Sequence, residues 1–347
     1  MSSFSSRRHF LRFALLGAGM LGAAPLLSLA PAAASAQTRD SGETYTRTAL
    51  FMGTLVTITV AGTPAAQAGD AVSAALALGR GMAETLTRFG SAGPLGQLNA
   101  TAALNDAPLE LVNLLQRSRQ MYALTGGAFD PTVLPLLHLF ESRRAHKTQK
   151  HLKLDQAELR HALEMVGMER VHVDGSALRL ERRGMGITLD GIAKGHIADA
   201  MSRRLSAEGC FNHCVNAGGD IVVSGGKGKG QPWRIAIEDP QGKNAYPQVV
   251  EMLDGAVATS GIYEVFYTAD ASRNHLINPV TGVSAGLVSV TVSAPDCLTA
   301  DALATAMAVM PPREALQLAD SLPGCACCLL RHDGLTQHSR NWRGRNA

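Results

Sequence analysis

The chain has 347 residues, of which 46% are hydrophobic, 18% are charged and 5% are aromatic, and its formal net charge is +3. This is the composition of a globular protein with one large domain or two ordinary ones, and by itself it excludes no class of function. Residues 1–36 contain three arginines and no acidic residue, so the rest of the chain is formally neutral. A neutral chain offers nucleic acid no basic surface, which excludes nucleic-acid binding as the expected function.

The N-terminal segment resembles a twin-arginine export signal. Arg7 and Arg8 precede an apolar run over residues 13–30, and the small residues 34–36 follow that run. Paired arginines, an apolar run and a small-residue cleavage site are the parts of such a signal. We expect export to the periplasm with cleavage near Ala36 and no permanent membrane anchor. A retained apolar anchor is the alternative.

The hydrophobic pattern predicts three elements in the first part of the chain. Alternating apolar residues predict a strand over 48–62. A helical period predicts helices over 66–87 and 107–124, and the double glycine at 126–127 ends the second of them.

The second part of the chain mixes strands and helices without regular alternation. A helix is expected over 198–209 and another from Thr299 onward. Strand-like segments cover residues 213–226, 233–240, 255–261 and 287–294. We therefore expect an α+β fold in which a mostly antiparallel sheet is flanked by helices.

Six cysteines are expected to be free and buried. In an oxidising compartment they could pair or bind a metal, but their spacing matches no standard zinc pattern and their neighbours are apolar. They are Cys210, Cys214, Cys297, Cys325, Cys327 and Cys328.

The glycine-rich segment 216–230 could be interpreted as a phosphate-binding loop, because backbone amides without side chains approach phosphate closely. It contains neither GxGxxG nor GxxxxGK[ST]. We expect a tight turn over 216–220 and a hairpin loop over 225–230 instead.

Several short segments carry polar groups that packing alone does not require. Taken singly, each has a structural explanation: Asp130 caps a turn, His275 is buried in the core, and Lys194 is solvated. In chain order the segments are MGT (52–54), TGGAFDPTV (125–133), LDGIAKGHIAD (189–199), NAGGDI (216–221), W-x-I-x-I-x-DP (233–240), ATSGIY (258–263), HLINPVTG (275–282) and ADALATAM (300–307).

Together and in this order, these segments resemble the ApbE family of FAD:protein FMN transferases over about residues 46–310. The resemblance implies a T-fold-like α+β domain that binds FAD, requires Mg²⁺, and attaches FMN through a phosphoester to a threonine or serine of a partner protein, releasing AMP. We accordingly expect a signal peptide over 1–36, a linker over 37–46, a flavin transferase domain over 47–335 and a basic tail over 336–347.

A metal site is expected on the last predicted helix. Asp301 and Thr305 are four residues apart, so their oxygens face the same side, and hard oxygen ligands suit Mg²⁺. The resemblance implies that both bind the metal together with the backbone carbonyl of Gly191. The structural alternative is helix capping by Asp301 and back-bonding to the helix by Thr305.

The resemblance also implies catalytic roles for two residues. Asp301 acts through the metal, which neutralises phosphoryl oxygens and stabilises the AMP leaving group. His275 is expected to accept the proton of the acceptor hydroxyl, because imidazole titrates near working pH.

Further positions of the resemblance imply contacts with FAD. Met52 and Phe89 are expected to cover the isoalloxazine, and Asp130 is expected to accept hydrogen bonds from flavin or ribose. The full set of expected FAD contacts is Met52, Phe89, Ala128, Phe129, Asp130, Thr188, Lys194 and Ile277.

The sequence departs from the family pattern at some positions. Asn278 stands where the family usually has aspartate, and Ala304 where some members have a second acidic residue. Two other functions therefore stay open, a non-catalytic FAD-binding assembly factor and an FAD pyrophosphatase that gives FMN and AMP.

The resemblance also implies a partner protein. The expected partner is a periplasmic or membrane-bound flavoprotein, such as a respiratory electron-transfer protein, with a Ser/Thr-Gly-Ala-Ser/Thr stretch.

Overall fold

The computed structural model describes residues 39–40, 44–143, 154–228, 230–238, 248–268 and 270–346. The predicted signal peptide, its cleavage site near Ala36 and residues 37–38 and 41–43 of the predicted linker lie outside these residues. Within the described ranges, no helix is both long and apolar enough to cross a membrane.

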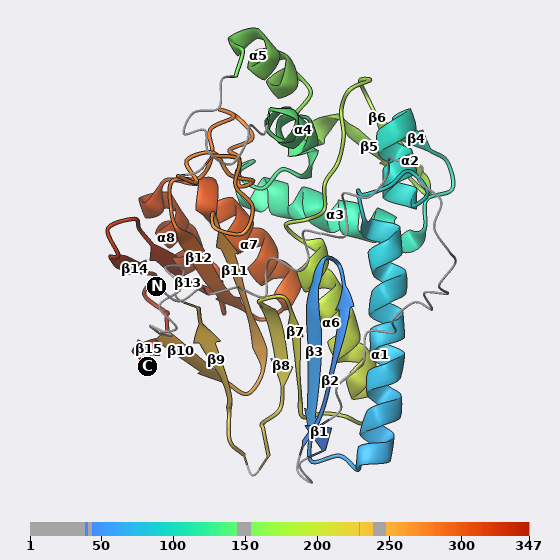
Figure 1. Cartoon of the computed structure of the whole chain (residues 1–347), viewed down its shortest axis with the longest axis vertical. Helices are drawn as coiled ribbons and strands as arrows, with labels where there is room; N and C mark the ends of the chain where they lie inside the picture. Colours follow the sequence, from blue (N-terminus) through green and yellow to red (C-terminus); the bar gives the residue numbers. More distant parts are fainter. Residues whose placement is uncertain are drawn as a thin grey trace, which may run out of the picture. The chain divides into compact units, whose positions relative to one another are not determined.

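A nine-stranded sheet forms the centre of the fold, and every neighbouring pair of its strands is antiparallel (Figure 1). In spatial order the strands are β1 (Arg39–Asp40), β2 (Thr44–Phe51), β3 (Thr54–Ala61), β7 (His213–Ala217), β8 (Asp220–Ser224), β11 (Gly255–Gly261), β12 (Ser289–Ala294), β13 (Ala326–Leu330) and β14 (Thr336–His338).

Two smaller antiparallel sheets accompany the large one. One has the order β15 (Arg345–Asn346), β10 (Gln248–Met252) and β9 (Trp233–Ile237). The other has the order β4 (Ala103–Leu104), β6 (Ala177–Leu180) and β5 (Val171–Asp174).

Three helices pack side by side against the large sheet, in the order α1, α6, α7 (Figure 1). Helix α1 contacts β2, α6 contacts β7 and β8, and α7 contacts β11 and β12. The helices are α1 (Ala65–Leu86), α2 (Pro94–Thr101), α3 (Leu109–Leu124), α4 (Leu134–Ser142), α5 (Gln156–Glu164), α6 (Ala193–Ala207), α7 (Cys297–Val309) and α8 (Pro312–Ser321).

Helix α7 is buried along almost its whole length, which explains its small-residue sequence. Its alanines are buried between α6 on one side and the strands β11 and β12 on the other. Small side chains allow this close approach. Ala304 is fully buried in this core.

The predicted strand over 48–62 is wrong, because the structure has a hairpin there. Met52 and Gly53 form a two-residue turn, with φ of 55° and 70°, between the paired residues Phe51 and Thr54. A two-residue turn in which both residues have positive φ joins two strands without interrupting the alternation of apolar residues. The pattern in the sequence therefore looked like one strand.

The predicted start of a helix at residue 198 is also wrong, since α6 begins at Ala193. Gly195 and Gly191 make this segment look like a turn in the sequence. In the structure, Gly195 is inside α6 and faces α7, where a Cβ atom would lie 2.3 Å from the carbonyl oxygen of Cys297. The glycine allows the two helices to touch.

Two other expectations can be compared with the structure. All six cysteines are free, five of them buried and Cys214 partly buried, which confirms the prediction. Residues 336–338 and 345–346, which the sequence places in a basic tail, form β14 and β15 at sheet edges.

Candidate functional site

The structure brings together the three residues expected to bind a metal. Helix α7 presents Asp301 and Thr305 one turn apart, and Gly191 precedes α6. A Cβ atom on Gly191 would lie 2.7 Å from Oγ1 of Thr305, so only glycine leaves this hydroxyl undisturbed. Oγ1 of Thr305 also lies 3.4 Å from Oγ of Ser260 on β11.

The carboxylate of Asp301 is buried, with only 3% of the residue exposed. Its Oδ2 accepts a hydrogen bond of 3.0 Å from the amide of Gly195. Burial and the neighbouring charge of Asp220 raise the pKa of Asp301 to about 8, although the charge of Lys194 opposes this. A cation bound next to Asp301 would therefore favour the ionised form of this carboxylate.

Mg²⁺ fits this set of donors. A carboxylate, a hydroxyl and a backbone carbonyl are the hard oxygen ligands that Mg²⁺ prefers, and the remaining positions are normally taken by water and substrate phosphate. Across the described parts of the chain, no group of three or more histidine, cysteine, aspartate or glutamate residues could hold a metal ion.

Lys194 lies in the first turn of α6 and forms a hydrogen-bonded ion pair with Asp220, the first residue of β8. Burial alone would lower the pKa of Lys194, but the charges of Asp220 and Asp301 outweigh burial and raise it. The lysine therefore stays protonated beside the metal residues. Its side chain is still 29% exposed, so a ligand can reach it.

His275 lies in the long connection between β11 and β12. Its Nδ1 is 3.0 Å from the carbonyl oxygen of Val265, and because a carbonyl can only accept, Nδ1 carries the proton. In the neutral ring this leaves Nε2 as a proton acceptor. Burial lowers the pKa of His275, while the charge of Asp190 raises it and that of Lys194 lowers it. His275 therefore lies within electrostatic range of Asp190 and Lys194, the neighbours of the metal residues.

Asp130 adopts the capping role that the sequence offered as its structural explanation. Its Oδ1 accepts hydrogen bonds from the amide and the hydroxyl of Thr132, at 2.8 and 2.6 Å, and its Oδ2 accepts one of 3.3 Å from the amide of Met168. Burial raises its pKa to about 6, against the effect of the Thr132 hydrogen bonds. A flavin contact by Asp130 would share these oxygens and stays a prediction.

The other predicted FAD contacts differ in exposure. Thr188 is held next to the Asp130 turn, because its amide donates a 2.7 Å hydrogen bond to the carbonyl of Pro131. Phe129 and Ile277 have buried side chains that belong to two core clusters, and Ala128 packs against the first of these clusters. Met52 is partly buried in its strained turn. Phe89, in the link between α1 and α2, is 69% exposed.

Sequence reasoning missed three residues that support the site. Asp199 on α6 accepts hydrogen bonds of 2.9 Å from the amides of Cys297 and Leu298, so it fixes the N-terminus of α7. Asp220 anchors Lys194, and Ser260 approaches Thr305. All three lie in segments quoted above (189–199, 216–221 and 258–263), and a polar residue among apolar neighbours was the signal available in the sequence.

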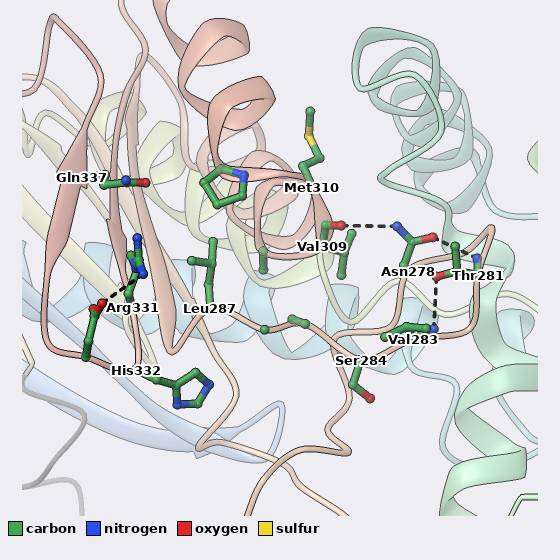
Figure 2. A pocket seen from close by; sticks show the side chains of 15 residues that line it. Asn278, Thr281, Val283, Ser284, Leu287, Val309, Met310, Arg331, His332 and Gln337 are labelled. Carbon is green, nitrogen blue, oxygen red and sulfur yellow. Dashed lines mark hydrogen bonds and ion pairs between the residues drawn. The ribbon is translucent and has the colours of Figure 1, made fainter.

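A cavity of about 650 Å³ lies beyond the C-terminal end of α7 (Figure 2). It shares two elements with the site, since Asn278 comes from the His275 connection and Val309 from α7. Nδ2 of Asn278 donates a 3.3 Å hydrogen bond to the carbonyl of Val309, and its Oδ1 accepts from the amides of Val280 and Thr281 at 3.0 Å each. Asn278 therefore connects the segment that carries His275 to the C-terminal end of helix α7.

Comparison with known proteins places the chain among proteins of known sequence and structure. A protein from Vibrio cholerae named FAD:protein FMN transferase is 32% identical over 216 residues, which is 61% of this chain and 64% of that protein, less than two thirds of its length. A protein of the same name from Klebsiella pneumoniae is 30% identical over 320 residues, 89% of each chain. The crystal structure of the ApbE protein from Thermotoga maritima matches with a TM-score of 0.74 and 28% identity, covering 86% of this chain and 97% of that one.

The structural match confirms the predicted α+β fold with its antiparallel sheet. The model of the ApbE family matches residues 52–329, which include every residue assigned above to the metal, the proton acceptor and the flavin contacts. The chain belongs to the ApbE family.

Proposed function

We propose that this protein transfers FMN from FAD to a serine or threonine hydroxyl of an acceptor protein and releases AMP. The observation that carries the proposal is the cluster of Asp301, Thr305 and Gly191, with Lys194 and His275 around it. The names of the Vibrio cholerae and Klebsiella pneumoniae relatives support the same reaction.

The reaction forms one bond and breaks one. The acceptor oxygen attacks the phosphorus of the FMN half of FAD, and the bond from that phosphorus to the oxygen bridging to AMP breaks, so AMP leaves with the electron pair. Nε2 of His275 accepts the proton of the hydroxyl. Lys194 provides positive charge near the pyrophosphate, and the pair with Asp220 fixes its position.

Asp301, Thr305 and the carbonyl of Gly191 would hold the Mg²⁺ ion, with Gly195 orienting the Asp301 carboxylate. When bound, Mg²⁺ neutralises the phosphoryl oxygens and stabilises the departing phosphate of AMP.

The proposed setting is the periplasm, and the proposed acceptor is a periplasmic or membrane-bound flavoprotein with a Ser/Thr-Gly-Ala-Ser/Thr stretch, such as a respiratory electron-transfer protein. The twin-arginine pattern of Arg7 and Arg8 supports export.

Intact mass spectrometry tests the proposal. An acceptor domain carrying this stretch is incubated with the purified protein, FAD and Mg²⁺, with EDTA as the control. A metal-dependent gain of one FMN less water is expected. Free FMN and AMP without acceptor would favour the pyrophosphatase. FAD that stays bound and intact, with no gain in several acceptors, would favour the assembly factor.

A further inference from the structure

Arg88 makes an unusual set of contacts for a residue in a connecting segment. It lies between α1 and α2, yet only 8% of its side chain is exposed. Its Nε donates a 2.7 Å hydrogen bond to Oδ2 of Asp190, and its Nη2 donates one of 3.0 Å to Oε1 of Glu141 on α4. Its guanidinium carbon lies 4.3 Å from the ring centre of Phe89.

These contacts join three segments: two carry predicted FAD contacts, and the third follows a turn that carries one. Phe89 is on the same link as Arg88. Asp190 lies between Thr188 and Gly191, in the loop over 187–192. Glu141 is on α4, which follows directly after the Asp130 turn. Arg88 therefore fixes the distances between segments that come from separate parts of the chain.

The charges keep this arrangement intact. Burial by itself would lower the pKa of Arg88, but the charges and hydrogen bonds of Asp190 and Glu141 outweigh burial and raise it. A buried guanidinium bonded to two carboxylates through its planar fork has a defined orientation.

Phe89 depends on that orientation. A ring that is 69% exposed receives little support from the core, and a cation over its face provides both a contact and a preferred angle. Preorganised contact surfaces raise affinity because less freedom is lost on binding.

We propose that Arg88 is a positioning residue that holds Phe89 and the loop over 187–192 in the arrangement that binds FAD. The inference rests on the proposed function and adds a residue that determines the affinity for FAD without touching the reacting atoms.

Flavin fluorescence titration measures the effect without turnover, using the purified full chain with EDTA and no acceptor. For Arg88→Met we expect the Kd for FAD to rise about tenfold or more, since charged hydrogen bonds and a cation–π contact are lost together. Arg88→Lys keeps the charge but not the planar fork, so an intermediate rise is expected from a variant that retains the buried cation.

The matched control is Arg80→Met. Arg80 is an exposed residue on α1 whose guanidinium carbon lies 5.8 Å from the ring centre of Phe51, so it offers the same kind of contact away from the three segments. Its Kd for FAD should equal that of the unmodified protein.

A double-mutant cycle separates positioning from a general loss of structure. If Arg88 acts through Phe89, the double variant Arg88→Met, Phe89→Ala should show a smaller increase in the Kd for FAD than the product of the increases measured for the two single variants. Multiplicative losses, or an Arg88→Met variant with unchanged Kd beside a binding wild type, would overturn this inference alone. No FAD binding by the unmodified protein, either in EDTA or with Mg²⁺ in its place, would overturn the proposed function as well.

Discussion

At the scale of single residues, the site depends on a few buried polar groups with few partners. Asp301 has a raised pKa because it is buried near Asp220, and the negative charges of both carboxylates raise the pKa of Lys194. Such a cluster is poorly balanced by protein groups alone. A divalent cation next to Asp301 would neutralise the excess negative charge, so we expect metal binding and the ionisation of Asp301 to be linked.

Replacing Asp301 by asparagine tests this link. The change keeps the shape and removes the charge, so we expect FMN transfer to fall at least about 100-fold, as for the loss of one electrostatic group from an active site. The transfer rate is measured by acceptor mass over a range of Mg²⁺ concentrations. Asp70→Asn on α1, away from the site, is the control. A variant with the normal Mg²⁺ dependence would remove Asp301 from the metal site.

The pH dependence of transfer tests His275. A proton acceptor works in its neutral form, and burial lowers the pKa of His275 below its usual 6.5. At saturating Mg²⁺, which would keep Asp301 ionised, transfer should therefore stay high as pH falls to 6.5 and decline only below that value, as the ring of His275 takes up a proton. His275→Ala should slow transfer about 100-fold or more, abolish this acid limb and leave FAD binding intact. An acid limb that persists in the variant would assign the titration to another group.

At the scale of elements, the site is the line of contact between α6 and α7. Asp199 of α6 bonds the first amides of α7, Gly195 allows the helices to touch, and Asp301 bonds back to Gly195. The separation of these helices therefore sets the distance between Gly191 and Thr305.

Gly195→Ala should disturb the site through this contact. The new Cβ atom would lie 2.3 Å from the carbonyl oxygen of Cys297, so the helices must separate, and we expect a loss of about 1–3 kcal/mol in the free energy of unfolding, together with slower transfer. Gly81→Ala is the matched control, because its Cβ would meet nothing within 4 Å inside α1 and should stabilise the helix slightly. Urea unfolding compares the two, and equal stability would contradict the helix contact.

Asn278 shows how a departure from the family pattern can be accommodated. Its amide donates to the carbonyl of Val309 at the end of α7 while its oxygen accepts from Val280 and Thr281. An aspartate has no donor for that carbonyl and adds negative charge at the C-terminal end of a helix.

Asn278→Asp should therefore destabilise this protein by about 1 kcal/mol. Thermal unfolding above pH 6, where the aspartate is ionised, provides the measurement. Asn278→Ser, which retains a small donor and acceptor, should lose less. An unchanged or raised Tm for the aspartate variant would show that the bond to Val309 is not formed.

At the scale of the whole molecule, local patterns predicted the fold class and the shared helix face of Asp301 and Thr305, while contacts between distant parts of the chain could not be predicted from the sequence. The common orientation of Asp301 and Thr305 could be predicted from the sequence, because residues four apart lie on one face of a helix. The partners of Arg88 lie 53 and 102 positions away in the chain, and no local period points to such a contact. The Met52–Gly53 turn was hidden for a different reason, since alternation continues through it.

The C-terminal residues give the last prediction, because they look like a solvated tail in the sequence and belong to the sheets in the structure. Ser339 exchanges hydrogen bonds with Cys327, through its Oγ at 2.8 Å and its amide at 3.0 Å. Nε1 of Trp342 donates a 2.8 Å bond to Gln248, and its ring stacks on His338. The C-terminal residues therefore form hydrogen bonds with both β13 and β10.

Deleting residues 336–347 should therefore lower the free energy of unfolding by about 3 kcal/mol, at about 1 kcal/mol for each of these three hydrogen bonds, and should expose the edge of β13. Replacing Arg340 and Arg343 by alanine removes basic charge but keeps the strands, so its stability should stay within about 0.5 kcal/mol of the unmodified protein. Urea unfolding of the three proteins decides the matter. If the deletion is as stable as the arginine variant, the segment acts only through its charge; if it alone is destabilised, the sheet edges need these strands to hold β13 and β10 in place.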